Sequence, residues 1–167
     1  RYFAADIPNA YGPNVHDPRT GEILESHIGW YHNVMSLLRD WYLVQAAAVD
    51  PRARNKNFDD KLMGELIRFV SSHEVGHTLG LRHNMGASNA TPVEMLRDKD
   101  FIEKNGHTSS IMDYARFNYV AQPEDNITDL FPRIGDYDKW AIKWGYSYFD
   151  GAKDEKEEKA LLNEMTK

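Results

Sequence analysis

The segment from His73 to His83 limits the possible folds of this chain more than any other. It reads HEVGHTLGLRH, so His73 and His77 lie four residues apart, one turn apart on one face of a helix. If the helix continued, His83 would lie about 15 Å along the axis from His73, too far to share a ligand. Gly80 can adopt a positive φ and is well placed to end the helix. The spacing therefore predicts a helix followed by a sharp turn that returns His83 to the other two histidines.

The residue types in this segment predict a metal centre. Three imidazole nitrogens that leave a fourth position open are typical of a catalytic zinc site. Glu74 is rotated by about 100° from His73 around the helix, so it flanks the metal, where a general base belongs. We predict that His73, His77 and His83 bind Zn²⁺ and that Glu74 is the base. Incidental histidines on a buried helix would not explain a glycine and a third histidine at the required positions.

A second motif follows downstream, where residues 110–114 read SIMDY. The two motifs together resemble the metzincin metallopeptidases, whose signature is this zinc motif followed by a Met-turn. The resemblance implies that Met112 forms an apolar floor under the metal and that Tyr114 ligates zinc or stabilises the reacting oxyanion. Position 84, directly after the third histidine, is asparagine, whereas several metzincin subfamilies carry an aspartate or another diagnostic residue there. The resemblance therefore indicates the metzincin superfamily, and does not assign the chain to the astacins, adamalysins or matrixins.

The resemblance extends beyond the motifs. Residues 17–24 resemble the turn and edge strand before the active-site helix, and residues 136–145 resemble the helix that closes many of these domains. As a whole, the chain resembles the Met-zincin core of large secreted bacterial zinc-dependent metalloproteases. This implies an endopeptidase with an extracytoplasmic location, either secreted or at the periplasm or cell surface. An extended peptide or protein substrate would then lie antiparallel to the edge strand at residues 22–28.

Composition excludes several other classes of function. At 167 residues the chain has the size of one domain with a real core. A net charge of −6 argues against a nucleic-acid partner, and no apolar run is long enough for a membrane span. The absence of cysteine excludes disulfides and thiolate ligands. Because the chain begins at Arg1 without a methionine, we expect it to be part of a longer protein with further domains.

Hydrophobic periodicity and capping signals predict one strand and four helices. The strand is expected at 22–30 and the first helix at 33–49. The metal-binding helix should begin at residues 59–60, because aspartate is a good N-cap. A Thr-Pro-Val-Glu capping box predicts a helix at 91–106. The last helix is expected at 136–145.

Apolar faces are predicted on three of these helices. That of the first helix consists of Leu37, Trp41, Val44 and Ala48. Leu62, Leu66 and Phe69 continue into His73 as one stripe, so the metal should lie on the core side of its helix. The last helix is expected to bury an apolar face, whose members are Tyr137, Trp140, Ala141 and Trp144.

These elements predict an α+β fold, a zincin-like metzincin core that is mostly helical. Because only one strand candidate precedes the metal-binding helix, we expect a truncated upper sheet. Residues 1–150 are assigned to the catalytic core, with residues 1–84 in an upper and 85–150 in a lower subdomain. Residues 151–167 are highly charged and are expected to form a linker or a peripheral helix.

The predicted function is that of a zinc-dependent endopeptidase, and two alternatives stay open. One is an inactive zinc-binding scaffold, although Glu74 would then have no purpose. The other is a zinc hydrolase of a non-peptide ester or amide, because the same chemistry serves both kinds of bond. Four further histidines lack ligand spacing with the motif, namely His16, His27, His32 and His107. His107 is expected to form hydrogen bonds in a loop, and Arg82 and Asn84 are expected in a solvated loop.

Overall fold

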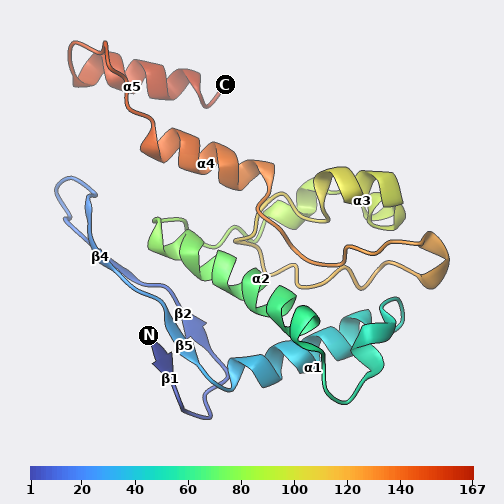
Figure 1. Cartoon of the computed structure of the whole chain (residues 1–167). Coiled ribbons are helices and arrows are strands. Elements are labelled where there is room, and N and C mark those ends of the chain that lie inside the picture. Colours follow the sequence, from blue (N-terminus) through green and yellow to red (C-terminus); the bar gives the residue numbers. More distant parts are fainter.

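The computed structural model describes all residues, 1–167, and has an α+β fold in which five short strands precede five α-helices (Figure 1). The strands are β1 (Tyr2–Phe3), β2 (Ala10–Tyr11), β3 (Asn14–His16), β4 (Ile23–Ser26) and β5 (Gly29–Tyr31). The helices are α1 (Val34–Ala46), α2 (Asp60–Thr78), α3 (Lys99–Asn105), α4 (Asp136–Tyr146) and α5 (Glu155–Glu164). Short 3-10 helices occupy Pro51–Arg54, Ala87–Ala90, Val93–Arg97 and Pro123–Asp125. The predicted α+β class, mostly helical with a small strand portion, is confirmed.

The strands form two small sheets, and the prediction of a single strand at 22–30 was wrong. In one sheet β5 pairs in parallel with β1 and antiparallel with β2. In the other, β3 and β4 form an antiparallel pair with a register shift between Val15 and His16. The region 22–30 therefore contains two strands of different sheets. The strands before residue 20 were missed because they are two or three residues long and carry no alternating apolar pattern.

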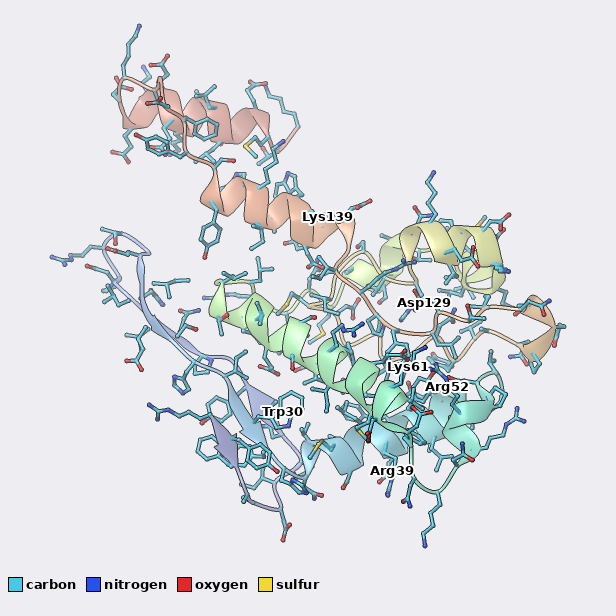
Figure 2. All side chains as sticks on the ribbon, in the orientation of Figure 1. Trp30, Arg39, Arg52, Lys61, Asp129 and Lys139 are labelled. Atoms are coloured by element: carbon cyan, nitrogen blue, oxygen red, sulfur yellow. The ribbon has the colours of Figure 1, made fainter.

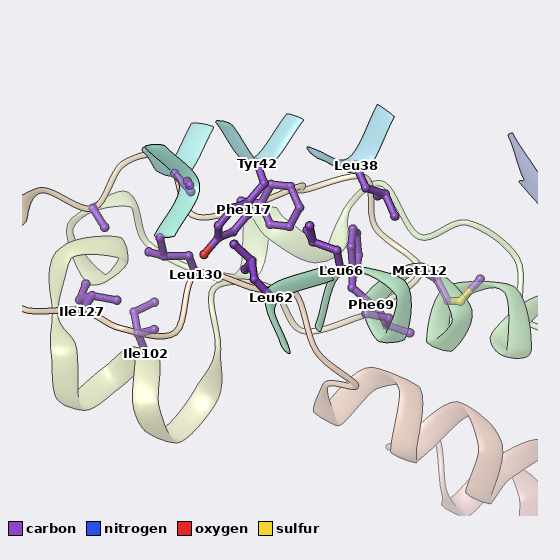
Figure 3. Close-up of a cluster of buried hydrophobic side chains, with 14 residues drawn as sticks. Leu38, Tyr42, Leu62, Leu66, Phe69, Ile102, Met112, Phe117, Ile127 and Leu130 are labelled. Carbon is purple, nitrogen blue, oxygen red and sulfur yellow. The ribbon is translucent and has the colours of Figure 1, made fainter. Parts of the chain in front are cut away.

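The core lies between α1, α2 and the loops that follow, where side chains fill the space (Figure 2). Leu38 and Tyr42 of α1 face Leu62 and Leu66 of α2, and all four are fully buried (Figure 3). Phe117, from the loop after the Met-turn, packs edge-on against the Tyr42 ring at 4.8 Å between centroids. Helix α2 buries the face that its periodicity predicts, so it has a fixed orientation at the point where it carries the histidines. The face predicted for α1 was wrong, because Val44 is 82% exposed and the buried residues of this helix are Val34, Leu38, Tyr42 and Ala46.

The region after α2 differs from the expected helix at 91–106. Its first part is the 3-10 helix Val93–Arg97, with no side-chain cap from the predicted capping box. A separate helix, α3, begins after Asp98, whose carboxylate accepts a hydrogen bond from the Phe101 N–H at 2.8 Å. Asp98 has an extended backbone, which a continuous helix cannot contain. The stronger cap at Asp98 therefore divides the segment in two.

Helix α4 lies where it was expected, but its predicted apolar face is not buried. Tyr137, Trp140 and Trp144 are exposed by 42%, 38% and 42%, whereas Asp138 is buried at 3%. The first turn of α4 docks onto the Met-turn through this aspartate, which leaves the aromatic side outside. Helix α5 lies beyond α4 at the periphery (Figure 1), where the Trp140 indole N–H donates to the Met165 carbonyl. None of the helices is long and apolar enough to cross a membrane.

Candidate metal centre

Helix α2 begins and ends where the sequence predicts. Asp59 caps its start, accepting a hydrogen bond from the Leu62 N–H at 2.8 Å. The helix ends at Thr78, and Gly80 has a φ of +91°, a conformation that residues with a Cβ rarely adopt. The chain then reverses direction, and the Leu81 N–H donates back to the Gly76 carbonyl. This turn brings His83 back beside the helix.

The three predicted ligands converge on one point. The Nε2 atom of His83 lies 3.0 Å from that of His77 and 3.2 Å from that of His73. Ligand nitrogens at the corners of a tetrahedron around zinc are roughly 3.3–3.4 Å apart for Zn–N bonds of about 2.0–2.1 Å. No other cluster of three or more histidine, cysteine, aspartate or glutamate side chains in the chain is placed to hold a metal ion. The spacing of the nitrogens thus fits a tetrahedral cation site.

Backbone carbonyls fix the tautomers of two of these histidines. The Nδ1–H of His73 donates to the Ile111 carbonyl at 2.8 Å, and that of His77 donates to the Leu81 carbonyl at 2.9 Å. Because a carbonyl only accepts, both protons are on Nδ1 and both Nε2 atoms present bare lone pairs. Burial also lowers the pKa of His73, which favours its neutral form. Lone pairs that face each other are stabilised by a cation, so the donor set fits Zn²⁺.

Glu74 is buried next to the histidines without a partner for one oxygen. It is 6% exposed, and its Oε2 atom has no hydrogen-bond partner in the protein. Burial raises the pKa of the Glu74 carboxyl, while His77 acts in the opposite direction. A carboxylate with a free oxygen and increased basicity is suited to accept a proton.

The Met-turn lies directly beneath α2. Met112 is fully buried, and a Cβ added to Gly76 would come within 2.3 Å of its Sδ atom. The glycine between the two helical histidines therefore permits this close approach, a role that the sequence-based expectations did not include. The Met112 carbonyl accepts from the Asn84 N–H at 3.0 Å, which ties the turn to the loop that carries His83.

Asp138 of α4 is the main support of the Met-turn and was not predicted. Its Oδ1 accepts from the Ser110 hydroxyl at 2.6 Å, and its Oδ2 accepts from the N–H groups of Ile111 at 2.7 Å and Gly135 at 2.9 Å. The carbonyl of the same residue, Ile111, accepts from His73, so Asp138 positions a ligand through one residue. The only sequence signal was an acidic residue in the first turn of a predicted helix, which is usually solvated.

Tyr114 stands beside the histidine cluster. Its ring centroid lies 4.5 Å from that of His83 and 5.6 Å from that of His73, and the residue is 46% exposed. The phenol is therefore close to the cluster and partly exposed to solvent.

Two cavities flank the cluster. The larger, of about 880 Å³, is lined by the β3–β4 hairpin, the end of α2 with His77, and Tyr146 of α4. The smaller, of about 260 Å³, is lined by His73 and Glu74 together with residues of α1 and the Met-turn. The hairpin and α4 also satisfy the last carbonyls of α2. Asn14 donates to the His77 carbonyl at 3.1 Å, and the Tyr146 hydroxyl donates to the Leu79 carbonyl at 3.0 Å.

The remaining histidines lie outside the cluster. His107 is buried, and its Nε2–H donates to the Arg116 carbonyl at 2.9 Å, so the expected hydrogen-bonding role in a loop is confirmed. His16 is in β3, and His27 and His32 flank β5. Arg82 is exposed, as expected.

An α+β fold that brings three histidines and a Met-turn to one point defines a zincin-like core. A family model described as Met-zincin matches residues 55–167, which is more than half of the chain. The chain therefore belongs to the Met-zincin family, and the resemblance seen in its motifs is confirmed. No curated protein and no solved structure matches the chain.

Proposed function

We propose that this chain is the catalytic core of a zinc-dependent endopeptidase. The observation that carries the proposal is the convergence of three Nε2 atoms beside a buried glutamate. The Nε2 atoms of His73 and His77 carry bare lone pairs, because the Nδ1–H group of each ring donates to a backbone carbonyl. Membership of the Met-zincin family supports a metallopeptidase-like activity with zinc as the metal.

His73, His77 and His83 would hold the zinc ion. When bound, the ion supplies Lewis acidity, which polarises the scissile carbonyl and lowers the pKa of water toward neutrality. The protein contributes fixed ligand orientations, through the Ile111 and Leu81 carbonyls.

Glu74 and Tyr114 are the residues that act on the substrate. The Glu74 carboxylate takes the proton of the attacking water and passes it to the leaving amine nitrogen. Its raised pKa brings the carboxyl closer to the working pH, which favours both transfers. The Tyr114 phenol donates a hydrogen bond to the oxyanion that develops on the substrate carbonyl.

A peptide is the substrate that the surroundings favour. Strand β4 has β3 as its one partner, so its other edge can accept an extended chain in antiparallel pairing. Ile23 at the start of β4 and Glu22 directly before it line the groove of about 880 Å³ that reaches His77. A small ester or amide would require a small closed pocket instead. An inactive scaffold is disfavoured because a buried, partly unpaired carboxyl is unfavourable unless it serves a purpose.

The proposal includes an extracytoplasmic location, which rests on the family resemblance. Fractionation of the source cells, with an antibody against this chain, tests the location. Detection of the protein in the cytoplasm alone would contradict it.

Digestion of an unfolded protein tests the activity. Zinc-loaded protein should cleave casein, a chelator should stop cleavage, and added zinc should restore it. Glu74→Gln should retain one zinc per chain and lose hydrolysis by about 10²–10⁴-fold, the usual contribution of a general base. Cleavage by Glu74→Gln near the wild-type rate would rule out the assigned base, and zinc-loaded protein without any hydrolysis would favour the scaffold.

A further inference from the structure

Arg116 occupies an unusual position two residues after Tyr114. The Cζ atom of its guanidinium lies 3.8 Å from the centroid of the Trp41 ring and 4.9 Å from that of Tyr114. Aromatic faces attract a guanidinium and orient its plane. The cation is therefore held between a side chain of α1 and the phenol next to the metal centre.

No carboxylate of the protein neutralises this cation. Arg116 forms none of the ion pairs of the chain, although it is half-buried. Every other lysine or arginine outside an ion pair is exposed. Burial lowers the pKa of the Arg116 guanidinium, and only the Tyr114 phenol acts in the opposite direction. A half-buried charge without a counter-ion is unfavourable, so folding alone does not explain its position.

The backbone at Arg116 is also strained and firmly held. Its φ is +58°, and Asn126 is the only other residue besides glycines with a positive φ. Arginine has no side-chain group that favours this conformation, whereas asparagine tolerates it. The Arg116 carbonyl accepts from the buried His107, and the next N–H, of Phe117, donates to the Gln45 side chain at 3.1 Å. Strain that neighbouring contacts maintain is typical of functional positions.

The guanidinium lines the cavity that contains the proposed general base. This cavity of about 260 Å³ is lined by Trp41, Tyr114 and Arg116, and also by His73 and Glu74. Asp113 also lines it, but the Asp113 carboxylate already accepts a hydrogen bond from the Ser88 N–H at 2.6 Å. The remaining walls are mostly apolar. Arg116 is thus the only cationic side chain that lines the cavity.

We propose that Arg116 binds a carboxylate of the peptide substrate in this cavity, so that the enzyme prefers peptides with a carboxylate close to the scissile bond. The inference rests on the proposed endopeptidase function and adds its substrate class. A guanidinium can donate two parallel N–H bonds to a carboxylate, and the two rings fix the plane in which it does so. The carboxylate comes from an aspartate or glutamate side chain or from the C-terminus of a peptide. Arg116 is a specificity-determining residue, because it contacts a part of the substrate that does not react.

Binding measurements separate this inference from the catalytic proposal. Zinc-loaded Glu74→Gln protein is titrated calorimetrically with short alanine–serine peptides, acetylated and amidated, in which one glutamate or one glutamine occupies each position in turn. The unsubstituted peptide with a free C-terminal carboxylate forms a third arm. We expect a glutamate peptide, or the free carboxylate, to bind about 10–100-fold more tightly than its uncharged counterpart, as a charge-assisted hydrogen bond implies. Which of the two peptides binds tightly identifies the source of the carboxylate.

The same titrations are then repeated with Arg116→Asn, Arg116→Lys and Arg39→Asn in the Glu74→Gln background. Asparagine tolerates the left-handed backbone, so Arg116→Asn should fold and lose the preference for a carboxylate. Lysine keeps the charge but not the planar pair of donors, so part of the preference should return. Arg39 also lies on α1, where Figure 2 labels it, and lines none of the cavities described above, so Arg39→Asn should bind like the parent.

Equal dissociation constants for charged and uncharged peptides would overturn the inference. So would an unchanged preference in Arg116→Asn. If wild-type protein cleaves casein without a preference for carboxylates, the inference fails and the endopeptidase function stands. If nothing is cleaved but the Arg116-dependent preference is measured, the endopeptidase function fails and the carboxylate site stands.

Discussion

The strand region, residues 1–33, and the Met-turn region, residues 107–118, border the same metal centre but are built differently. In the strand region only Gly12 and Gly29 are buried, so its structure depends mainly on backbone hydrogen bonds. In the Met-turn region most residues are buried, and several polar side chains are hydrogen-bonded inside the protein. Stability and ligand geometry should therefore depend more on the Met-turn region than on the strand region.

Single contacts illustrate this difference. The Met-turn region reaches the first ligand through a chain of buried hydrogen bonds from Asp138 through Ile111 to His73. The strand region touches α2 near the second ligand through one half-buried hydrogen bond from Asn14 to the His77 carbonyl. Loss of the first connection leaves several buried polar groups unpaired, whereas loss of the second exposes one carbonyl to water.

The largest expected effect is that of Asp138→Ala. It leaves the Ser110 hydroxyl and two buried N–H groups without an acceptor, so unfolding free energy should fall by about 3–5 kcal/mol. Urea unfolding measures this loss, and zinc affinity should fall with it. Asn14→Ala is the matched change in the strand region, with an expected loss of about 0.5–1.5 kcal/mol. Equal losses of unfolding free energy in the two variants would contradict the difference between the Met-turn region and the strand region.

Next in size is the effect of Tyr114→Phe on catalysis. If the phenol donates to the oxyanion only in the transition state, kcat and kcat/KM should fall together by about 10²–10³-fold with little change in KM. Zinc affinity should stay near that of the wild type because the three histidines are intact. Steady-state kinetics on a fluorogenic peptide decide the matter, and a rate within a few-fold of wild type would assign Tyr114 a packing role only.

Gly76→Ala should have an intermediate effect, at the closest contact between α2 and the Met-turn. The added Cβ would meet the Met112 Sδ atom at 2.3 Å, so the buried Met112 side chain must move, at about 1–3 kcal/mol of unfolding free energy. Met112→Ala removes the clashing sulfur, so the double variant should lose less than the sum of the two single variants. Additive losses in this cycle would show that the two residues do not share one contact.

The smallest expected effect is a pH dependence from His107. Burial lowers the pKa of His107, so the folded state keeps it neutral while the unfolded chain takes up a proton below about pH 6.5. Stability due to this group is therefore present above pH 6.5 and declines as pH falls toward the folded-state pKa. In metal-free protein, His107→Gln should reduce the slope of unfolding free energy against pH by up to about 1.4 kcal/mol per pH unit. Identical slopes would contradict a neutral buried His107.

The sequence predicted best the parts of the fold that bury a regular apolar face. Leu62, Leu66 and Phe69 fixed the position and orientation of α2, and Gly80 fixed its end. The strands before residue 20 were missed because they bury almost no side chains and so carry no period of two. The capping box at Thr91 was overridden by Asp98, because the chain had two competing caps and local preference alone does not rank them.

The site was predictable only where one short segment encodes it. His73, His77 and His83 meet because helix geometry and one glycine determine their separation. Asp138 and Gly76 support the site through contacts with the Met-turn, and their roles depend on how distant segments pack. An acidic residue on a helix and a glycine within one have the same appearance in sequence whether they are buried or solvated.

Zinc coordination tests the central claim most directly. Purified protein, reconstituted with zinc and dialysed, should contain one zinc per chain. X-ray absorption at the zinc edge should show three imidazole nitrogens at about 2.0–2.1 Å and one further light ligand. His77→Ala should lose most of the bound metal under the same dialysis, while His107→Ala, which removes a histidine outside the cluster, should retain it. Full zinc content in His77→Ala, or an absorption spectrum without three imidazoles, would contradict the account.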